Sequence, residues 1–208
     1  MDNKNRNGKK PTVKKEEYAV VLDYLSRGYV KSDMSKFGGK PIAQAIGKEK
    51  FTLLELAPKN GVDLEIQDTV YIGKGKRDKI YRVLGKLDYE NLTATSRIEL
   101  DYAIRDIVVE NEEKYVKFFN EADSVSTRMH SLELIPGIGK KYMWDIIKAR
   151  EQKPFESFED ISERLPTLAD PAAMIVNRVK QELDTTKPKR GKNKYYLFTQ
   201  PPRAPRQK

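Results

Sequence analysis

The amino-acid sequence predicts an α+β protein in which a small β-barrel is followed by an all-α domain. Three observations support this fold class. Apolar residues alternate with a period of two in short runs between residues 17 and 87, which is typical of strands. From residue 96 onward they recur every three or four residues, which is typical of helices. The two ends of the chain are basic and contain proline and glycine, so we expect them to be disordered tails.

Residues 16–94 are predicted to form the barrel. In the first strand, Tyr18, Val20, Leu22 and Tyr24 alternate with the residues between them. Four more strands are predicted at Pro41–Ile46, Phe51–Ala57, Thr69–Ile72 and Lys79–Leu87. Short strands of this number, with no apolar stripe of helical length between them, predict a small closed barrel of the OB-like type.

Residues 95–121 are predicted to form helices that link the barrel to the C-terminal half. Ser96 and Glu99 have the spacing of a capping box. An apolar series at helical spacing follows them: Leu100, Ala103, Ile104, Ile107 and Val108. A second apolar stripe, from Tyr115 to Phe119, either continues the same helix or forms a second one after Asn111.

Residues 122–184 are predicted to be all-α. A first short helix ends at Leu134, and Pro136 leads through a very tight turn into a new helix. Two further helices are indicated by their cap residues. They are expected around residues 158–165, capped by Ser157, and at Ala172–Leu183, preceded by Asp170 and Pro171.

The tight turn is a candidate anion site. Glycines at 137 and 139 permit positive φ, so that the amides of Gly137, Ile138 and Gly139 can point outward at the start of the next helix. Lys140 and Lys141 add positive charge beside them. One helix N-terminus contributes only about 0.3 to 1 kcal/mol, so a bound nucleic acid would need further contacts.

The residues around this turn carry a resemblance. The segment Leu134–Lys141, followed by Ile146 and Ile147, resembles a helix-hairpin-helix motif, which clamps phosphate in many proteins that handle DNA and RNA. The segment Pro154–Ile161 is similar to the stretch that follows this motif in tandem helix-hairpin-helix domains. The turn at Leu165–Ala172 has no Gly-hydrophobic-Gly sequence. One phosphate-binding hairpin is therefore expected, and the role of the second turn stays open.

Over residues 16–200 the chain resembles an archaeal family described as nucleotide-binding proteins, whose common domain has no known function. The resemblance is carried by Glu17–Ala19, Gln44–Gly47, Phe51–Leu56, Tyr71–Gly75, the hairpin and Tyr195–Phe198. It implies an OB-like barrel followed by a helix-hairpin-helix domain, with a link to RNA or the translation apparatus. A looser similarity in architecture is to RuvA, which binds Holliday junctions and also places an OB barrel before helix-hairpin-helix units.

Two further segments are candidate binding sites. The loop that carries Lys74, Lys76, Arg77 and Lys79 either grips a phosphate backbone, as loops of OB folds do, or is a solvated hairpin tip. Residues 194–199 are expected to pair with the barrel as a strand or to pack on it, with base stacking by their aromatic rings as the alternative.

The composition excludes several classes of protein. The 208 residues include no cysteine and one histidine, so disulfides, thiolate nucleophiles and clustered metal ligands are not expected. His130 has no identifiable acid-base partner and is expected at a helix end or on the surface. Trp144 is expected in the core, with a partner contact as the alternative. The longest run without a charge, Tyr195–Pro202, is far shorter than the about 18 residues of a membrane helix. We therefore expect a cytoplasmic protein that binds no membrane.

The positive charge is concentrated in the tails. Residues 1–15 have a net charge of +5 and residues 185–208 a net charge of +8, whereas the whole chain has +9. Residues 16–184 therefore have a net charge of −4. Basic arms on a mildly acidic body are typical of proteins that follow a polyphosphate, because each neutralised phosphate releases counterions. A contribution to solubility alone is the alternative.

From these patterns we expect a non-enzymatic nucleic-acid-binding protein that needs no cofactor or metal, with RNA favoured over DNA. The residues expected to bind are Gly137, Ile138, Gly139, Lys140, Lys141, Lys74, Lys76, Arg77 and Lys79. Two alternatives stay open: a DNA-binding repair or recombination factor of RuvA-like architecture, and an adaptor for ribosomal or transcription proteins. The adaptor is favoured by residues 95–184, which hold 13 basic and 18 acidic residues.

Overall fold

Five strands pair as one antiparallel sheet in the order β4-β1-β2-β3-β5. The strands are β1 (Tyr18–Leu25), β2 (Ile42–Gly47), β3 (Leu53–Pro58), β4 (Thr69–Tyr71) and β5 (Ile80–Lys86). Each lies where the sequence predicts a strand, and the predicted α+β class is confirmed. The computed structural model describes residues 15–29, 39–184 and 195–201. The predicted basic tails, residues 1–15 and 185–208, therefore fall largely outside the described residues.

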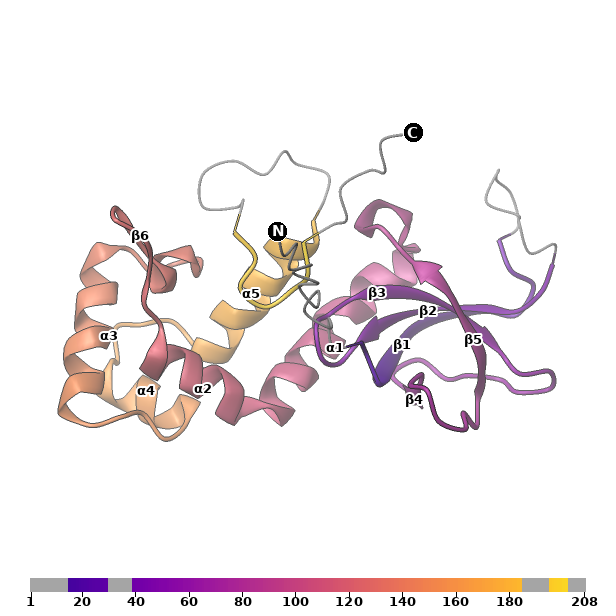
Figure 1. Ribbon diagram of the computed structural model, residues 1–208, viewed down its shortest axis with the longest axis horizontal. Helices are drawn as coiled ribbons and strands as arrows, with labels where there is room; N and C mark the ends of the chain where they lie inside the picture. The colour runs from indigo at the N-terminus through magenta and orange to yellow at the C-terminus, as the bar shows by residue number, and fades with distance from the viewer. Residues whose placement is uncertain (1–14, 30–38, 185–194, 202–208) are drawn as a thin grey trace, which may run out of the picture.

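The sheet is curled but does not close into the predicted barrel (Figure 1). β4 and β5 are its edges, and no backbone pairing joins them in the part of the chain that the structure describes. β4 has only three residues, which pair with β1. β5 pairs with β3 across two register shifts, and such bulges bend and twist a strand. The two edges are instead linked by an ion pair of 2.6 Å between Lys79 Nζ and the Asp68 carboxylate.

The two faces of the sheet pack into different cores. Small and aliphatic side chains of the inner face, among them Val21, Ala45 and Leu56, form one cluster. Alternate residues of the same strands, such as Leu22 and Ile46, face helix α1 (Ala94–Glu110) and join a larger cluster that extends through the other helices. Figure 1 shows α1 lying between the sheet and the remaining helices. Packing is therefore continuous across residue 94, and the division of the chain into separate units stays a prediction.

Helix α1 begins earlier than predicted. Its N-cap is Thr93, whose hydroxyl accepts a hydrogen bond from the Ser96 N–H (3.0 Å) and donates one to the Asp23 carboxylate (2.6 Å). The Ser96 hydroxyl is buried with no hydrogen-bond partner, and Glu99 accepts a hydrogen bond from the side chain of Gln67. The predicted capping box of Ser96 and Glu99 is therefore wrong. The contact between Thr93 and β1 decides where the helix starts.

The remaining helices agree with their sequence signals. They are α2 (Glu112–Glu121), α3 (Lys140–Gln152), α4 (Phe158–Arg164) and α5 (Pro171–Leu183). α2 is separate from α1 and follows Asn111, which was one of the two expected arrangements. Ser157 and Asp170 cap α4 and α5 as predicted, each accepting a hydrogen bond of 3.0 Å from a first-turn amide. No helix in residues 15–29, 39–184 and 195–201 is long and apolar enough to cross a lipid bilayer.

The sequence predicted an all-α C-terminal half. This prediction is wrong, because that half contains a two-stranded ribbon. β6 (Ser124–Ser126) and β7 (Met129–His130) pair antiparallel and project beside α3 (Figure 1). These strands have three and two residues, which is too short for a period of two to be visible in the sequence.

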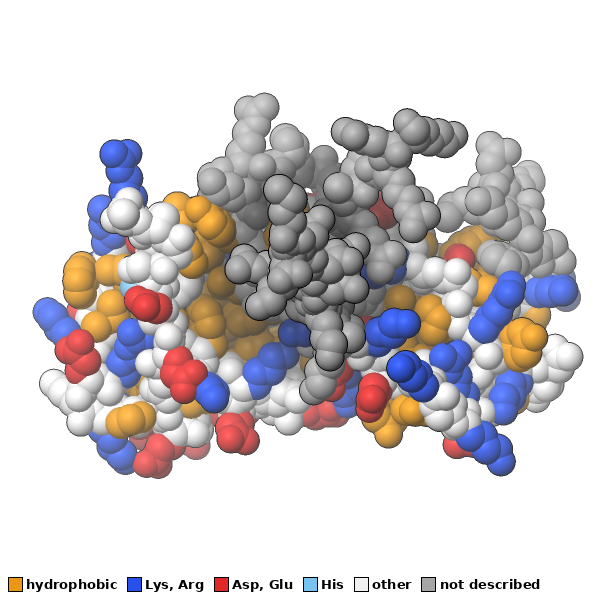
Figure 2. All heavy atoms as spheres, viewed as in Figure 1, with side chains coloured by type: hydrophobic (Ala, Val, Ile, Leu, Met, Phe, Trp, Pro, Cys, Tyr) orange, Lys and Arg blue, Asp and Glu red, His pale blue; other side chains and the backbone are white. Residues whose placement is uncertain are grey.

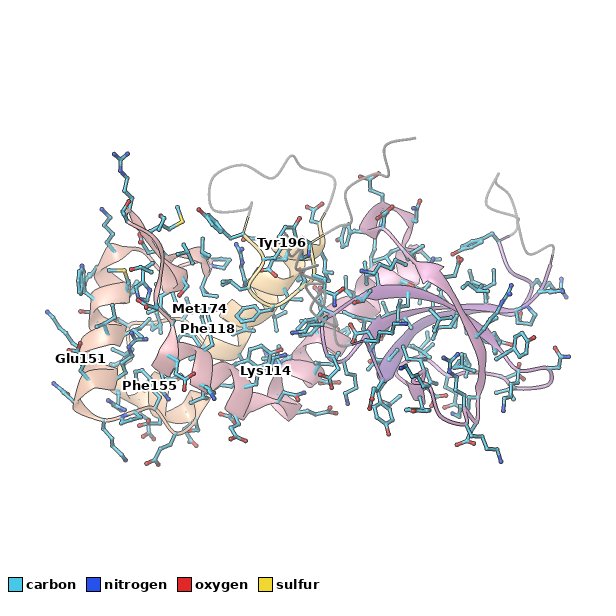
Figure 3. The ribbon with its side chains drawn as sticks, viewed as in Figure 1. Lys114, Phe118, Glu151, Phe155, Met174 and Tyr196 are labelled. Carbon is cyan, nitrogen blue, oxygen red and sulfur yellow. The ribbon has the colours of Figure 1, made fainter. Side chains whose placement is uncertain are left out.

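Lys114 joins the helices to the turn between β2 and β3. Its Nζ lies 5.1 Å from the centre of the Tyr115 ring and 6.0 Å from that of the Phe51 ring. Figure 3 shows Lys114 where the helices meet the sheet. Burial lowers the pKa of Lys114, and the neighbouring charge of Lys50 adds to this effect. The ammonium group is held over two aromatic faces in the geometry of a cation–π contact.

The C-terminal segment, residues 195–201, is anchored on α5 and also contacts the sheet at Gln200, whose Oε1 accepts a hydrogen bond of 3.3 Å from Lys86 Nζ of β5. The Glu182 carboxylate accepts hydrogen bonds from the N–H groups of Leu197 (2.7 Å), Phe198 (3.0 Å) and Thr199 (2.9 Å). The buried Phe198 ring packs edge to face on Phe118 at 5.2 Å. The described residues 195–199 form no strand with the sheet, and Glu182 binds the backbone donors of residues 197–199 instead. The other expected arrangement, packing on the sheet, is seen at Phe198, which shares a core cluster with Leu53 of β3. Base stacking by Phe198 is excluded by its burial; residue 194 lies outside the described residues.

The stability of the fold is expected to depend on Tyr29 at alkaline pH. The Tyr29 hydroxyl donates a hydrogen bond of 2.7 Å to the Glu55 carboxylate. Burial and this carboxylate raise the pKa of Tyr29 to about 12, from an ordinary value of 10.0. Because the folded protein holds this proton more tightly, the stabilisation is complete below pH 10 and is lost as pH rises toward 12. Tyr29→Phe should therefore reduce the fall in melting temperature over this pH range.

The measurement is thermal unfolding of the wild-type chain and the variant at a series of alkaline pH values. Tyr102→Phe, at an exposed position on α1, is the matched control and should keep the wild-type slope. An identical slope in all three proteins would contradict the assignment to Tyr29.

Candidate functional site

The β6–β7 ribbon leads into the hairpin through a 3₁₀ turn, η2 (Ser131–Leu134). His130 caps this turn, because its Nδ1 accepts a hydrogen bond of 3.1 Å from the Leu132 N–H. The Glu133 carboxylate in return accepts one of 3.0 Å from the His130 N–H, which completes a capping box. Burial, with the charge of Arg150, lowers the pKa of His130. The expectation that His130 lies at a helix end is confirmed.

Gly137 and Ile138 form the turn itself. Gly137 has φ +89°, in the left-handed region that favours glycine, and a Cβ there would lie 3.3 Å from Met174 Cε. The Ile138 side chain is buried, as predicted. Its N–H donates to the Ile135 carbonyl at 3.1 Å. Three amides were predicted to point outward at an anion. The amide of Ile138 is not available for this, because it is hydrogen-bonded within the turn.

Gly139 is the N-cap of α3 and has no side chain to cap it. Its φ of −91° and ψ of −178° are extended, so of the two glycines that permit a positive φ only Gly137 adopts one. A Cβ at Gly139 would meet nothing within 4 Å. The first backbone bond of α3 joins the Met143 N–H to the Gly139 carbonyl. The N–H groups of Lys140, Lys141 and Tyr142 therefore have no partner within the helix.

A shallow depression of about 410 Å³ opens beside this helix start. It is lined by η2, the turn and Gln181 of α5, and the side chains of Lys140 and Lys141 are exposed next to it. The free amides and the positive end of the helix dipole favour an anion here. One carboxylate, that of Glu133, also lines the depression, but it accepts the hydrogen bond from His130 described above.

In the basic loop between β4 and β5, two of the four cations already make contacts within the protein. Arg77 Nε donates to the Gly73 carbonyl at 2.9 Å, and Lys79 pairs with Asp68 as described above. That ion pair lowers the pKa of Asp68. Lys74 and Lys76 are exposed and have no ion pair in the described structure. Of the four predicted phosphate ligands, these two are therefore free to bind.

The two predicted binding segments are not brought together. α3 lies at one end of the long axis of the molecule, whereas β4, which precedes the basic loop, lies in the other half, with the sheet (Figure 1). A single ligand that touches both must be long and must run along the molecule.

The structure also bears on three other features of the sequence: Trp144, the second turn and a metal site. Trp144 is 55% exposed, so the expectation that it belongs to the core is wrong: it faces outward from α3. In the second turn, the Thr167 carbonyl accepts a hydrogen bond of 2.9 Å from the Tyr142 hydroxyl of α3. Among the described residues, no group of three or more His, Asp or Glu side chains is arranged to hold a metal ion.

Sequence reasoning missed the residue pair that holds the hairpin in place. Arg178 of α5 donates to the Leu134 carbonyl (3.0 Å), at the entrance to the turn, and to the Glu182 carboxylate (2.7 Å). The only available signal is an Arg and a Glu four residues apart on an otherwise apolar helix face. Local sequence does not show that this face becomes fully buried.

These features define a mixed α+β protein in which a curled five-stranded antiparallel sheet is joined to a set of helices. The chain belongs to the family of proteins of unknown function DUF655, whose family model matches residues 15–200. It is 48% identical over 184 residues to the uncharacterized protein MJ0038 of Methanocaldococcus jannaschii, covering 88% of this chain and 79% of that protein.

A solved relative shares the fold. The crystal structure of Af1531 from Archaeoglobus fulgidus, of the same family, superposes with a TM-score of 0.79 at 44% sequence identity. The match covers 89% of this chain and 100% of that chain. The predicted membership of an archaeal family of unknown function is confirmed, and nucleotide binding stays a prediction.

Proposed function

We propose that this protein is a non-enzymatic nucleic-acid-binding protein, with RNA favoured over DNA, that holds a backbone phosphate at the start of α3. The observation that carries the proposal is the uncapped N-terminus of α3. Gly139 leaves its first amides open, and Lys140 and Lys141 add charge beside them. Phosphate binding at such a terminus follows from the free N–H groups and the helix dipole together.

The proposed footprint extends beyond this one contact, because a single helix end binds too weakly. Lys74 and Lys76, which are exposed and have no ion pair in the described structure, would neutralise further phosphates beside the sheet. The sequence of the turn supports a helix-hairpin-helix motif, and the strand order supports an OB-like sheet that is open between β4 and β5. A role beside the ribosome or translation apparatus rests on the family resemblance alone.

A test follows from the conformation of Gly139. Its extended φ and ψ are those of an ordinary N-cap, and there is room for a side chain. In Gly139→Asp the new carboxylate is expected to cap the amides of α3 and to occupy the anion site itself. The melting temperature should stay the same or rise, while affinity for RNA should fall about five-fold, which corresponds to about 1 kcal/mol. Fluorescence anisotropy with a structured RNA measures the affinity.

The matched control for this variant is Thr95→Asp, which adds the same charge at an exposed position in the first turn of α1. It should keep the affinity within about two-fold, because charge alone acts weakly at a distance in salt. A Gly139→Asp variant that is folded and binds RNA as tightly as the wild-type chain would overturn the proposed phosphate site.

A second candidate function, a protein adaptor, is favoured by the outer face of α1. Ile98, Tyr102 and Val109 are exposed there at helical spacing. Substituting all three by serine should abolish capture of a protein partner that survives nuclease treatment. Capture that is wholly lost on nuclease treatment would instead favour the nucleic-acid-binding function.

A further inference from the structure

A β-bulge in β5 turns two consecutive side chains to the outside of the sheet. Ala57 pairs with Arg82 and Pro58 pairs with Ile80, so Tyr81 has no opposite residue on β3. Regular alternation would place Ile80 and Arg82 on the same face. Instead Ile80 is buried in the inner core, whereas Tyr81 and Arg82 are both exposed. Bulges often redirect side chains next to binding sites.

Tyr81 borders an open groove of about 550 Å³ on the outer side of the sheet. The floor of the groove is apolar and is formed by Ile42, Ala57 and Leu84 among others. Its basic side chains are Lys40, Lys59 and Arg82, of which Lys59 already donates a hydrogen bond to the Arg77 carbonyl and Arg82 already has an interaction partner. No carboxylate lines it. Figure 2 shows Lys and Arg side chains gathered over the half of the molecule that holds the sheet.

The exposure of Tyr81 has no structural explanation in the described chain. The ring is 70% exposed, the highest value among the large apolar side chains of the described residues. A ring left in water in a groove that is also lined by basic side chains gains nothing for the fold, but it is a suitable platform for a planar ligand that carries negative charge.

The geometry points to a second nucleic-acid site in this groove, where a single-stranded segment stacks one base on Tyr81 and places a flanking phosphate on Lys40. This inference rests on the proposed nucleic-acid binding and names the class of nucleic acid. In a duplex the base faces are covered by their neighbours, so only an unpaired base can stack on the ring. Stacking with cationic flanks is the usual mode of binding single strands without reading their sequence. An acidic peptide would match the cations but would leave the ring unused.

The site is tested by fluorescence anisotropy with the full chain, a labelled single-stranded RNA of mixed sequence and a fully paired RNA duplex. Salt of about 0.2 M weakens contacts made through charge alone. Tyr81→Ala is expected to weaken binding of the single strand about ten-fold, as for the loss of one stacked base, and to leave duplex binding unchanged. Tyr81→Phe keeps the ring and should restore the wild-type affinity. The exposed position of Tyr81 makes both variants compatible with folding.

Tyr102→Ala is the matched control, because it removes another exposed tyrosine ring, on α1 and outside the groove. Unchanged single-strand affinity in Tyr81→Ala, or an equal loss for single strand and duplex, would overturn the groove site and leave the proposed function standing. Displacement of the single strand by polyglutamate of the same charge would also overturn it, in favour of an acidic peptide. Absence of binding by the wild-type chain to every RNA probe would overturn the proposed function as well.

Discussion

Glu182→Ala should lower the free energy of unfolding by about 3 to 5 kcal/mol, the range measured when one partner of a buried ion pair is removed. The side chains of Glu182 and Arg178 are each 1% exposed, and Arg178 Nε lies 2.7 Å from Glu182 Oε1. Without Glu182 the guanidinium group would remain buried with its charge uncompensated. The N–H groups of Leu197, Phe198 and Thr199 would also lose their acceptor.

The expected fall in melting temperature is about 6 to 20 °C, since 1 kcal/mol shifts a chain of this size by about 2 to 4 °C. Hydrogen exchange should show early loss of protection at residues 197–199 and weaker protection of the hairpin, which Arg178 holds through the Leu134 carbonyl. Glu163→Ala, at an exposed position on α4, is the control and should leave the melting temperature almost unchanged. A melting temperature of Glu182→Ala equal to that of the control would refute the structural role of the pair.

Gln44→Leu should destabilise the fold by about 2 to 4 kcal/mol, because it leaves two backbone groups at the start of α1 without partners. Gln44 is fully buried in β2. Its Oε1 accepts from the Thr93 N–H at 2.9 Å, and its Nε2 donates to the Asn91 carbonyl at 3.0 Å. The same Nε2 donates to the Tyr29 hydroxyl at 3.0 Å. One amide therefore joins the sheet, the β1–β2 connection and the N-cap of α1.

Denaturant unfolding measures this effect. Gln152→Leu, at the exposed end of α3, makes the same chemical change where no buried group depends on it and should shift the midpoint little. Leucine has nearly the volume of glutamine, so a loss of stability in Gln44→Leu would report the missing hydrogen bonds rather than a cavity. A midpoint equal to that of Gln152→Leu would show that water replaces the lost partners.

Elements defined by local signals could be predicted from the sequence. The strands follow from alternation, and the starts of α4 and α5 follow from Ser157 and Asp170, whose side chains cap the amides next to them in sequence. Predictions that depended on distant contacts were wrong. Ser96 has the spacing of a cap, yet Thr93 caps α1, because Asp23 and Gln44 hold its hydroxyl and amide.

The candidate site shows the same division. Gly137 was recognised from the Pro-Gly-Ile-Gly sequence, because a turn this tight needs a residue with positive φ. The sequence could not show which N–H groups have hydrogen-bond partners. The N–H of Ile138 is hydrogen-bonded inside the turn, whereas the N–H groups at the start of α3 have no partner within the helix. Nor could alternation place Tyr81 and Arg82 together on the outside, because the bulge that does so arises from pairing with β3.

By itself the sequence determined the positions of the five strands of the sheet and of α2 to α5, the hairpin turn, the absence of cysteine chemistry and the concentration of positive charge in the tails. These properties depend on residue type, on local periodicity and on hydrogen bonds between near neighbours. Only the tertiary structure decided that the sheet stays open and that Glu182 binds the backbone N–H groups of residues 197–199. It also decided which cations already have an ion-pair partner. Each of these outcomes is a competition between partners far apart in the chain, and burial and geometry settle it only when the whole chain is packed.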